Sequence, residues 1–331
     1  MRRTLRAFLI LFVFTLLINN SPSAYSKTAG GLTLVFIFKS DSSLNQPYYL
    51  AAFNYYRQQQ ESNPNITIIR NIESLEETIA VINSQSKPVS QVFLVSHASH
   101  WSGLSIPLTS NTQGKTSSTQ LLNFLSDKQP QVNTNAYSTN PVITVEGCAI
   151  GSNTILLDVL ENYYSAKDGT KPDVKAPIGY MLFYYTNNEP ALDIQFFKTE
   201  VPVLEITLPF ATEYTTNDFL EAFSKEYGDT LPWELALELP YSSLMTNAYT
   251  HKKRTLTLGS YGYQSDIEKF DSPIEYIKKH KNIRQQLQEY NISADKFKWT
   301  FEKTEQKNII KITGKSLAIT VFDSSKVQKA R

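Results

Sequence analysis

The chain has 331 residues, of which 12% are aromatic and 19% charged, and its 32 basic residues nearly balance 31 acidic ones. This composition excludes a disordered chain, and the charge balance excludes a strongly basic nucleic-acid-binding protein. The single cysteine, Cys148, excludes an internal disulfide. The four histidines lack metal-binding spacing; His97 and His100 would share a helix face, but they follow a strand pattern. We expect no metal and no cofactor.

Residues 1–26 have the pattern of a cleaved export signal. Three arginines precede an apolar run from Ala7 to Ile18 that is short for a membrane span, and Ala24-Tyr25-Ser26 places small residues where a signal peptidase cuts. Cleavage there would leave 29 basic and 31 acidic residues, a net charge of −2. The pattern predicts a periplasmic or secreted protein. A retained signal anchor is the alternative, and only then would we expect contact with a membrane.

Strand and helix patterns alternate through the first half of the chain. Continuous β-branched and aromatic runs predict strands, and apolar residues at helical spacing predict helices between them. Ser74 is a candidate N-cap for the second helix. The order predicts an α/β fold with a mainly parallel sheet and helices on both faces. The predicted strands are 32–39, 65–70, 91–96 and 141–145, and the predicted helices are 47–60, 75–82, 117–125 and 152–163.

The pattern changes in the second half. Two further strands are predicted at 177–185 and 201–208, followed by a helix at 217–227 and a lysine-rich amphipathic helix at 273–290. Three short strands at 297–302, 308–313 and 317–322 predict a small β-meander with turns at 304–307 and at Gly314-Lys315. We predict an α/β domain at 27–215 and a C-terminal helical and β-meander region at 216–331, to which the sequence assigns no chemistry.

Two of the predicted strands end on reactive side chains, His97 and Cys148. Ligands of open α/β sheets collect at the carboxyl ends of the strands, and the ends of neighbouring strands lie about 5 Å apart. The thiol and the imidazole are therefore candidates for a nucleophile and base. A helix predicted from residue 152 should lower the pKa of the Cys148 thiol. One alternative is that Cys148 is a buried, unreactive side chain that only packs at the strand end. Another is that His97 forms hydrogen bonds with neighbouring backbone groups and has no catalytic role. Glu146 is expected to be structural, held by backbone groups or by a cation.

The two motifs resemble those of the caspase, legumain and gingipain group of cysteine peptidases. Residues 146–152, Glu-Gly-Cys-Ala-Ile-Gly-Ser, are similar to the legumain motif Glu-Ala-Cys-x-x-Gly-Ser, and residues 96–99 with Gly103 are similar to its Asp-His-Gly-Ser. The resemblance covers about residues 31–190. It implies a three-layer αβα caspase-like domain, with Cys148 as nucleophile, His97 as acid–base group and the backbone N–H groups of Cys148 and Ala98 as oxyanion donors. Ala98 replaces the family's glycine, and it can serve where no positive φ is needed.

The resemblance predicts an exported cysteine peptidase, a hydrolase of peptide or protein substrates. One alternative is an exported, non-catalytic binding protein on the same scaffold with a vestigial His/Cys pair, since a fold does not fix a function. A lesser alternative is a hydrolase or transpeptidase that acts on a non-protein amide.

Three further residues are candidates for the substrate pocket. The resemblance implies that the loop 40–43 lines it, and its one charge, Asp41, would favour Arg or Lys in the substrate. Asp41 is also a candidate helix cap or a solvated residue. If Asp41 does not contribute, the pocket is expected among Asn187, Asn188 and Glu189. His100 is the competing imidazole, and with Trp101 it is expected at the surface or lining a substrate groove.

Overall fold

The computed structural model describes residues 31–39, 47–112, 114–127, 132–187, 194–241, 247–306 and 308–325. The predicted export signal and three predicted pocket residues, Asp41, Asn188 and Glu189, lie outside these ranges. Within them, no helix combines the length and the apolar character that crossing a membrane would require.

A five-stranded parallel sheet with the order β2-β1-β3-β6-β7 forms the centre of the first half of the chain. Its two central strands, β1 and β3, carry runs of five and four apolar residues, as expected for strands buried on both faces. The predicted α/β class with a mainly parallel sheet is confirmed, and the strand before His97 lies beside the strand before Cys148. The strands are β1 (Leu32–Phe38), β2 (Ile66–Ile72), β3 (Val89–Val95), β6 (Tyr137–Glu146) and β7 (Asp173–Lys175).

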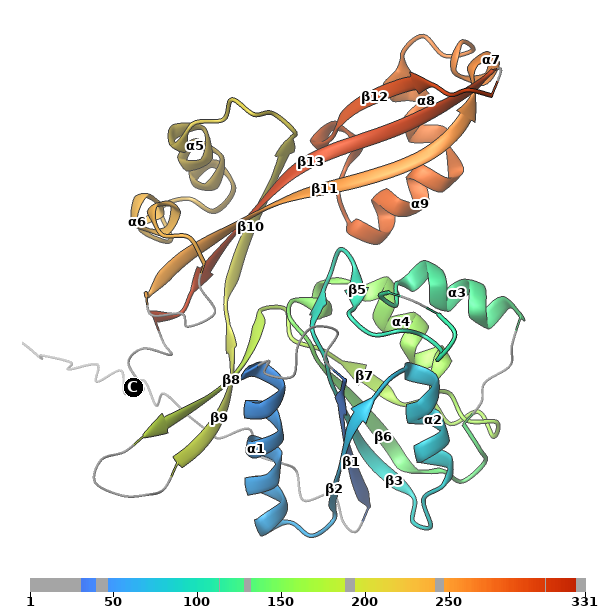
Figure 1. The fold of residues 1–331 in the computed structure, drawn as a ribbon, viewed down its shortest axis with the longest axis vertical. Helices are drawn as coiled ribbons and strands as arrows, with labels where there is room; N and C mark the ends of the chain where they lie inside the picture. The colour runs from blue at the N-terminus through green and yellow to red at the C-terminus, as the bar shows by residue number, and fades with distance from the viewer. Residues whose placement is uncertain are drawn as a thin grey trace, which may run out of the picture. The chain divides into compact units, whose positions relative to one another are not determined.

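Helices cover both faces of this sheet (Figure 1). On one face, α2 (Leu75–Asn83), α3 (Ser118–Asp127) and α4 (Thr154–Tyr163) share a single apolar core with the strands. On the other face lies α1 (Pro47–Ser62), whose Tyr56 ring is 5.3 Å from the Phe93 ring of β3. The side chain of Ser74 accepts a hydrogen bond from the backbone N–H of Glu77, so the predicted N-cap of α2 is confirmed.

The two strands predicted after residue 176 do not extend the parallel sheet. The first forms β8 (Tyr180–Asn187), an antiparallel hairpin with β9 (Ile194–Val201). The second forms β10 (Val203–Pro209), which pairs with a strand near the end of the chain. The C-terminal sheet therefore begins before residue 216, where the sequence analysis places its boundary.

The C-terminal sheet is antiparallel, with the order β10-β13-β11 and with β12 paired to β13. At one end α5 and α6 pack on it, and at the other end α8 and α9 do (Figure 1). Its remaining strands are β11 (Tyr249–Tyr263), β12 (Lys298–Lys303) and β13 (Ile309–Asp323). The helices are α5 (Thr216–Tyr227), α6 (Trp233–Glu238), α7 (Gln264–Ile267), α8 (Pro273–Lys279) and α9 (Lys281–Tyr290).

Two predictions for this region are wrong. The turn expected at Gly314-Lys315 is absent, because β13 continues through it, and a Cβ on Gly314 would lie 2.5 Å from the Trp299 ring. The glycine therefore allows close packing rather than a turn. The helix expected over 273–290 breaks at His280, which has an extended ψ of 115° and whose side chain accepts a hydrogen bond from the backbone N–H of Ile283.

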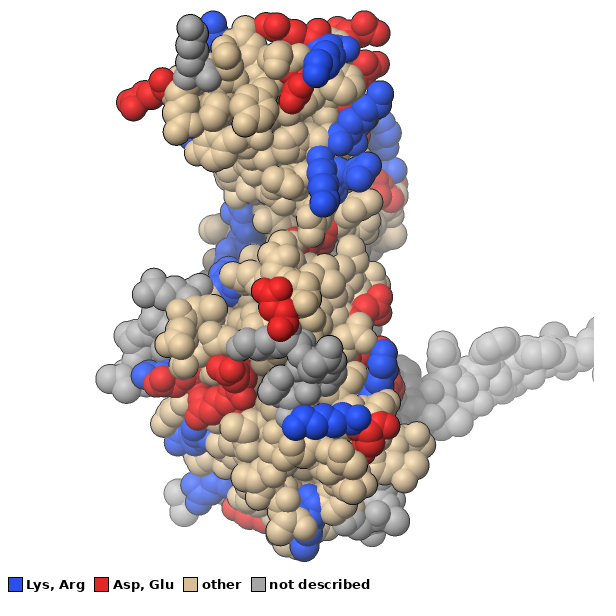
Figure 2. All heavy atoms as spheres, turned by 90° about the vertical axis from the view of Figure 1, so that its right-hand side faces the viewer, with Lys and Arg blue, Asp and Glu red and all other residues tan. Residues whose placement is uncertain are grey.

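Charge is unevenly distributed over the surface, although the net charge of the chain is near zero. On the face drawn in Figure 2, acidic and basic side chains are interspersed over the lower part. Basic side chains gather along one side of the upper part, which the C-terminal sheet and its helices form. Local surfaces of one sign therefore exist on a nearly neutral protein.

Candidate active site

The register of β3 and β6 brings the two sequence motifs to one edge of the parallel sheet. Val95 of β3 pairs with Glu146 of β6, and both strands end at these residues. The backbone N–H of Ser96 then donates to the carbonyl of Glu146, at 3.3 Å. His97 and Cys148 each follow two residues after this last pair. The parallel alignment therefore delivers the imidazole and the thiol from adjacent chain segments.

Gly147 allows these two segments to touch. A Cβ placed on it would lie 2.5 Å from the Cβ of Ala98 and 3.1 Å from the carbonyl oxygen of Ser96. Ala98 is not among the described residues with a positive φ, so alanine fits the backbone here, and it pairs with Leu104 in the short ribbon of β4 (Ala98–Ser99) and β5 (Gly103–Leu104). The backbone at Ala98 therefore needs no positive φ, which is the condition under which alanine can replace the glycine here.

Two tyrosines from the first turn of α1 hold the His97 side of the site. The Tyr48 ring stacks on the imidazole with centroids 4.8 Å apart, and the Tyr49 ring meets it nearly edge-on at 5.1 Å. The Tyr49 hydroxyl accepts from the backbone N–H of His97 at 3.1 Å. The Tyr48 hydroxyl donates to the backbone carbonyl of Glu146 at 2.7 Å, so this one side chain contacts both motifs. Sequence reasoning missed both residues; their place at the start of the helix that follows the first strand was the available signal.

The thiol of Cys148 lies against the β8–β9 hairpin. Its Sγ is 3.8 Å from the carbonyl oxygen of Met181, and the side chain is partly buried. Burial raises the pKa of the thiol to about 11, although the charges of Arg254 and Lys252 act in the opposite direction. Burial also raises the pKa of Tyr48 well above its usual value, and the charge of Glu146 acts in the same direction. The resting site therefore holds a neutral thiol next to a neutral phenol.

The prediction that a following helix lowers the pKa of Cys148 is wrong. Helix α4 begins at Thr154, and Asn153 caps it by accepting from the backbone N–H of Leu156. Ala149, in the left-handed region with φ 53°, and the short 3₁₀ helix Ile150–Ser152 separate the thiol from that helix. The field of a helix terminus falls off within about one turn, so burial dominates.

Glu146 is structural, as the sequence analysis expects. Its side chain is fully buried, and its Oε1 lies 2.6 Å from Lys198 Nζ on β9. The lysine lies within 6 Å of the centres of three aromatic rings, at 5.6 Å from Tyr55, 5.9 Å from Tyr56 and 5.4 Å from Phe93. Within the part of the chain that the structure describes, Glu146 Oε2 has no hydrogen-bond partner. A single ammonium group therefore balances this buried charge.

His100 faces the C-terminal sheet. Its Nε2 lies 3.3 Å from Glu205 Oε2 of β10, and the two side chains are only 13% and 18% exposed. Burial, aided by the charge of Arg254, lowers the pKa of His100 to about 4, and burial raises the pKa of Glu205 to about 7. The Thr320 hydroxyl donates to Glu205 Oε1 at 2.6 Å. This imidazole is neutral near pH 7 and contacts β10, and Trp101 beside it is buried, so the expected surface position of these two residues is wrong.

No group of three or more histidine, cysteine, aspartate or glutamate side chains is placed to hold a metal ion among the described residues. No family model, no curated protein and no solved structure shows significant similarity to the chain. What it does must therefore be inferred from the site itself.

Proposed function

We propose that the protein is an exported cysteine peptidase in which His97 and Cys148 hydrolyse an amide bond. The observation that carries this proposal is the β3–β6 register, which aligns Val95 with Glu146 and so starts both reactive segments at one sheet edge. The contact of Gly147 with Ala98 supports it, because it keeps those segments adjacent beyond the strands.

The raised pKa of Cys148 decides how the thiol would be activated. A thiolate–imidazolium pair is disfavoured in the resting site, so His97 acts as a general base during attack. The Sγ–H proton passes to the imidazole as sulfur bonds to the substrate carbonyl carbon, and the imidazole then protonates the departing amine as the C–N bond breaks. Water, deprotonated by His97, hydrolyses the thioester and the proton returns to sulfur. The backbone N–H groups of Ala98 and Cys148 stabilise the oxyanion.

Labelling by an electrophilic peptide probe tests the proposal. At neutral pH the probe should label Cys148 stoichiometrically, as mass spectrometry of the intact protein would show. His97→Ala should abolish labelling, whereas the matched loss of an imidazole in His100→Ala should leave it unchanged, because His100 is engaged with Glu205. Equal labelling rates in the native protein and in His97→Ala would refute the role of His97 as the base that activates Cys148.

Substrate preference and export need separate tests. Cleavage of a peptide library by the native protein and by Asp41→Ala would show whether that carboxylate selects Arg or Lys. Export predicts that the mature chain begins at Lys27, which N-terminal sequencing of the natural protein would reveal.

A second candidate is a non-catalytic exported binding protein on the same scaffold. It is favoured by the partly buried thiol and its contact with the Met181 carbonyl. Iodoacetamide alkylation of Cys148 should rise only above pH ~8.5, the ordinary thiol value, under either function. The two functions differ at neutral pH: the binding protein would leave Cys148 unlabelled by the peptide probe, with or without His97.

A further inference from the structure

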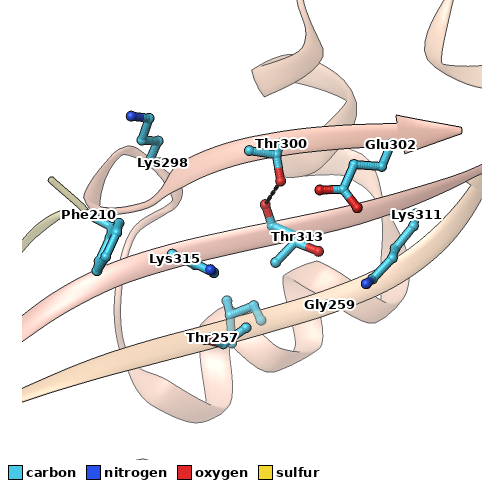
Figure 3. A pocket seen from close by; sticks show the side chains of 10 residues that line it. Phe210, Thr257, Gly259, Lys298, Thr300, Glu302, Lys311, Thr313 and Lys315 are labelled. Atoms are coloured by element: carbon cyan, nitrogen blue, oxygen red, sulfur yellow. Dashed lines mark hydrogen bonds between the residues drawn. The ribbon is translucent and has the colours of Figure 1, made fainter. Parts of the chain in front are cut away.

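A trough of about 540 Å³ lies on the C-terminal sheet, over β11, β13 and β12 (Figure 3). Ile310 and Ile312 of β13 pack against α8 and α9, so the alternating residues Lys311, Thr313 and Lys315 point to the opposite face. Farther along β13 that opposite face is covered, since its Ile319 and Val321 pack against α5 and α6. The trough is the stretch of this face that none of the described helices covers.

The charges of the trough are arranged in rows across the strands. Lys298 of β12 pairs directly with Lys315 of β13, and Glu302 pairs with Lys311. Figure 3 places the first pair at one end, beside Phe210, and the second pair at the other end, with the threonine pair Thr300 and Thr313 between them. The trough therefore has a basic end, a polar middle and a mixed end.

The basic end has no acidic partner among the described residues. Like charges directly opposite each other destabilise a sheet, yet Lys298 and Lys315 are exposed and form no ion pair with any described residue. The third member of their row is Thr257, which is uncharged. The Phe210 ring lies 5.7 Å from Lys315 Nζ and holds that ammonium beside an apolar surface. An anion between the two lysines would relieve their repulsion.

The spacing of the cations identifies the ligand. Lys311 and Lys315 are four positions apart on one strand, a separation of about 13 Å. An extended peptide has the same repeat, so carboxylates four residues apart would reach both lysines. A nucleic acid carries closely and evenly spaced phosphates, and the threonine pair Thr300 and Thr313 between the two lysine rows offers them no cation. We propose that the trough binds an extended acidic segment of a polypeptide. This inference stands independently of the peptidase proposal.

Fluorescence anisotropy with the full-length protein tests the proposal. The probe is a labelled peptide of serine and threonine that carries two glutamates four residues apart. We expect saturable binding that salt weakens, and a loss of affinity of about tenfold or more in the double variant Lys298→Gln/Lys315→Gln. Lys303→Gln removes one lysine charge from β12 outside the trough, half of what the double variant removes, and should change the affinity by less than about twofold. Thermal unfolding of each variant verifies that the fold is retained.

Three results would overturn the proposal. The first is equal binding of a peptide in which glutamine replaces both glutamates, since charge would then not be recognised. The second is an equal loss of affinity in Lys303→Gln, since the trough would then not be the site. The third is tighter binding of an oligothymidylate of matched length, which would make the surface a site for a phosphate polymer.

Discussion

The two sheets of the molecule expose their polar groups in opposite ways. The parallel sheet is covered on both faces and presents His97 and Cys148 only at the edge where β3 and β6 end. The antiparallel sheet leaves part of one face open, with lysines and threonines in solvent. At the edge, burial determines the protonation and stability of the side chains. On the open face, the arrangement of charges determines how the side chains interact. Substitutions should therefore lower the free energy of unfolding strongly at the edge and change it little in the trough.

The largest effect is expected at the buried pair of Glu146 and Lys198. Lys198→Met leaves the fully buried carboxylate without its cation, which should lower the free energy of unfolding by about 3–5 kcal/mol. Adding Glu146→Gln removes the stranded charge and should recover most of the loss. Urea denaturation measures both changes. A loss below about 1 kcal/mol in the single variant would show that burial does not dominate at this edge.

The next effect concerns His100 and Glu205 and depends on pH. The pKa of Glu205 rises from 4.5 to about 7 on folding, so its contribution to stability is present below pH 4.5 and is lost as pH rises to 7. The pKa of His100 falls from 6.5 to about 4, so its contribution is lost as pH falls from 6.5 to 4. The two largely cancel between pH 4.5 and 6.5 in the native protein.

Removing one of the two side chains should reveal the pH dependence of stability that the other contributes. In Glu205→Gln, stability should fall by about 2–3 kcal/mol as pH drops from 6.5 to 4 relative to the native protein. In His100→Gln, it should fall by a similar amount as pH rises from 4.5 to 7. Thermal unfolding across this range checks both slopes. Parallel profiles for the two variants would contradict the opposed pKa shifts.

A smaller loss is expected where the two motifs touch. Gly147→Ala places a Cβ 2.5 Å from that of Ala98, and such overpacking should cost about 1–3 kcal/mol. Ala98→Gly in the same chain removes the opposing Cβ and should restore part of the loss. Denaturation and peptide-probe labelling would be measured together. If Ala98→Gly gives no recovery, the strain lies instead against the Ser96 carbonyl.

The smallest effect, and one of opposite sign, is expected in the trough. Lys298→Glu replaces a like-charged cross-strand pair with an opposite-charged pair, which should raise the free energy of unfolding by about 0.5 kcal/mol. The same change should weaken binding of the acidic peptide. A loss of stability would indicate that Lys298 packs within the sheet. Burial would then matter on the open face as well as at the edge of the parallel sheet.

Much of the parallel sheet could be predicted from the sequence, because the doubly buried strands β1 and β3 carry the apolar runs Leu34–Phe38 and Val92–Val95. The C-terminal sheet was harder for a physical reason. Strand β11 has lysine, threonine and glycine along its open face, so it carries no strong strand pattern and was missed. The break at His280 contains neither proline nor glycine, so the helical pattern runs through it.

The residues of the candidate site were likewise predictable only in part. His97 and Cys148 were predictable because each follows its own strand directly, and position along the chain reveals this. Tyr48 and Lys198 reach the site from α1 and β9, and only tertiary packing brings them there. The pKa of Cys148 could not be predicted, since it depends on how completely the β8–β9 hairpin covers the thiol.

The length of β13 has a consequence for how the protein opens. Its Ile310 and Ile312 belong to the core under α8 and α9, its Ile319 and Val321 to the core under α5 and α6, and its Phe322 packs near Ala149 and Cys148. One strand thus belongs to three cores, and none of them can fray without disturbing it. Amide hydrogen exchange should therefore find the C-terminal region opening as one cooperative unit rather than as two independent lobes.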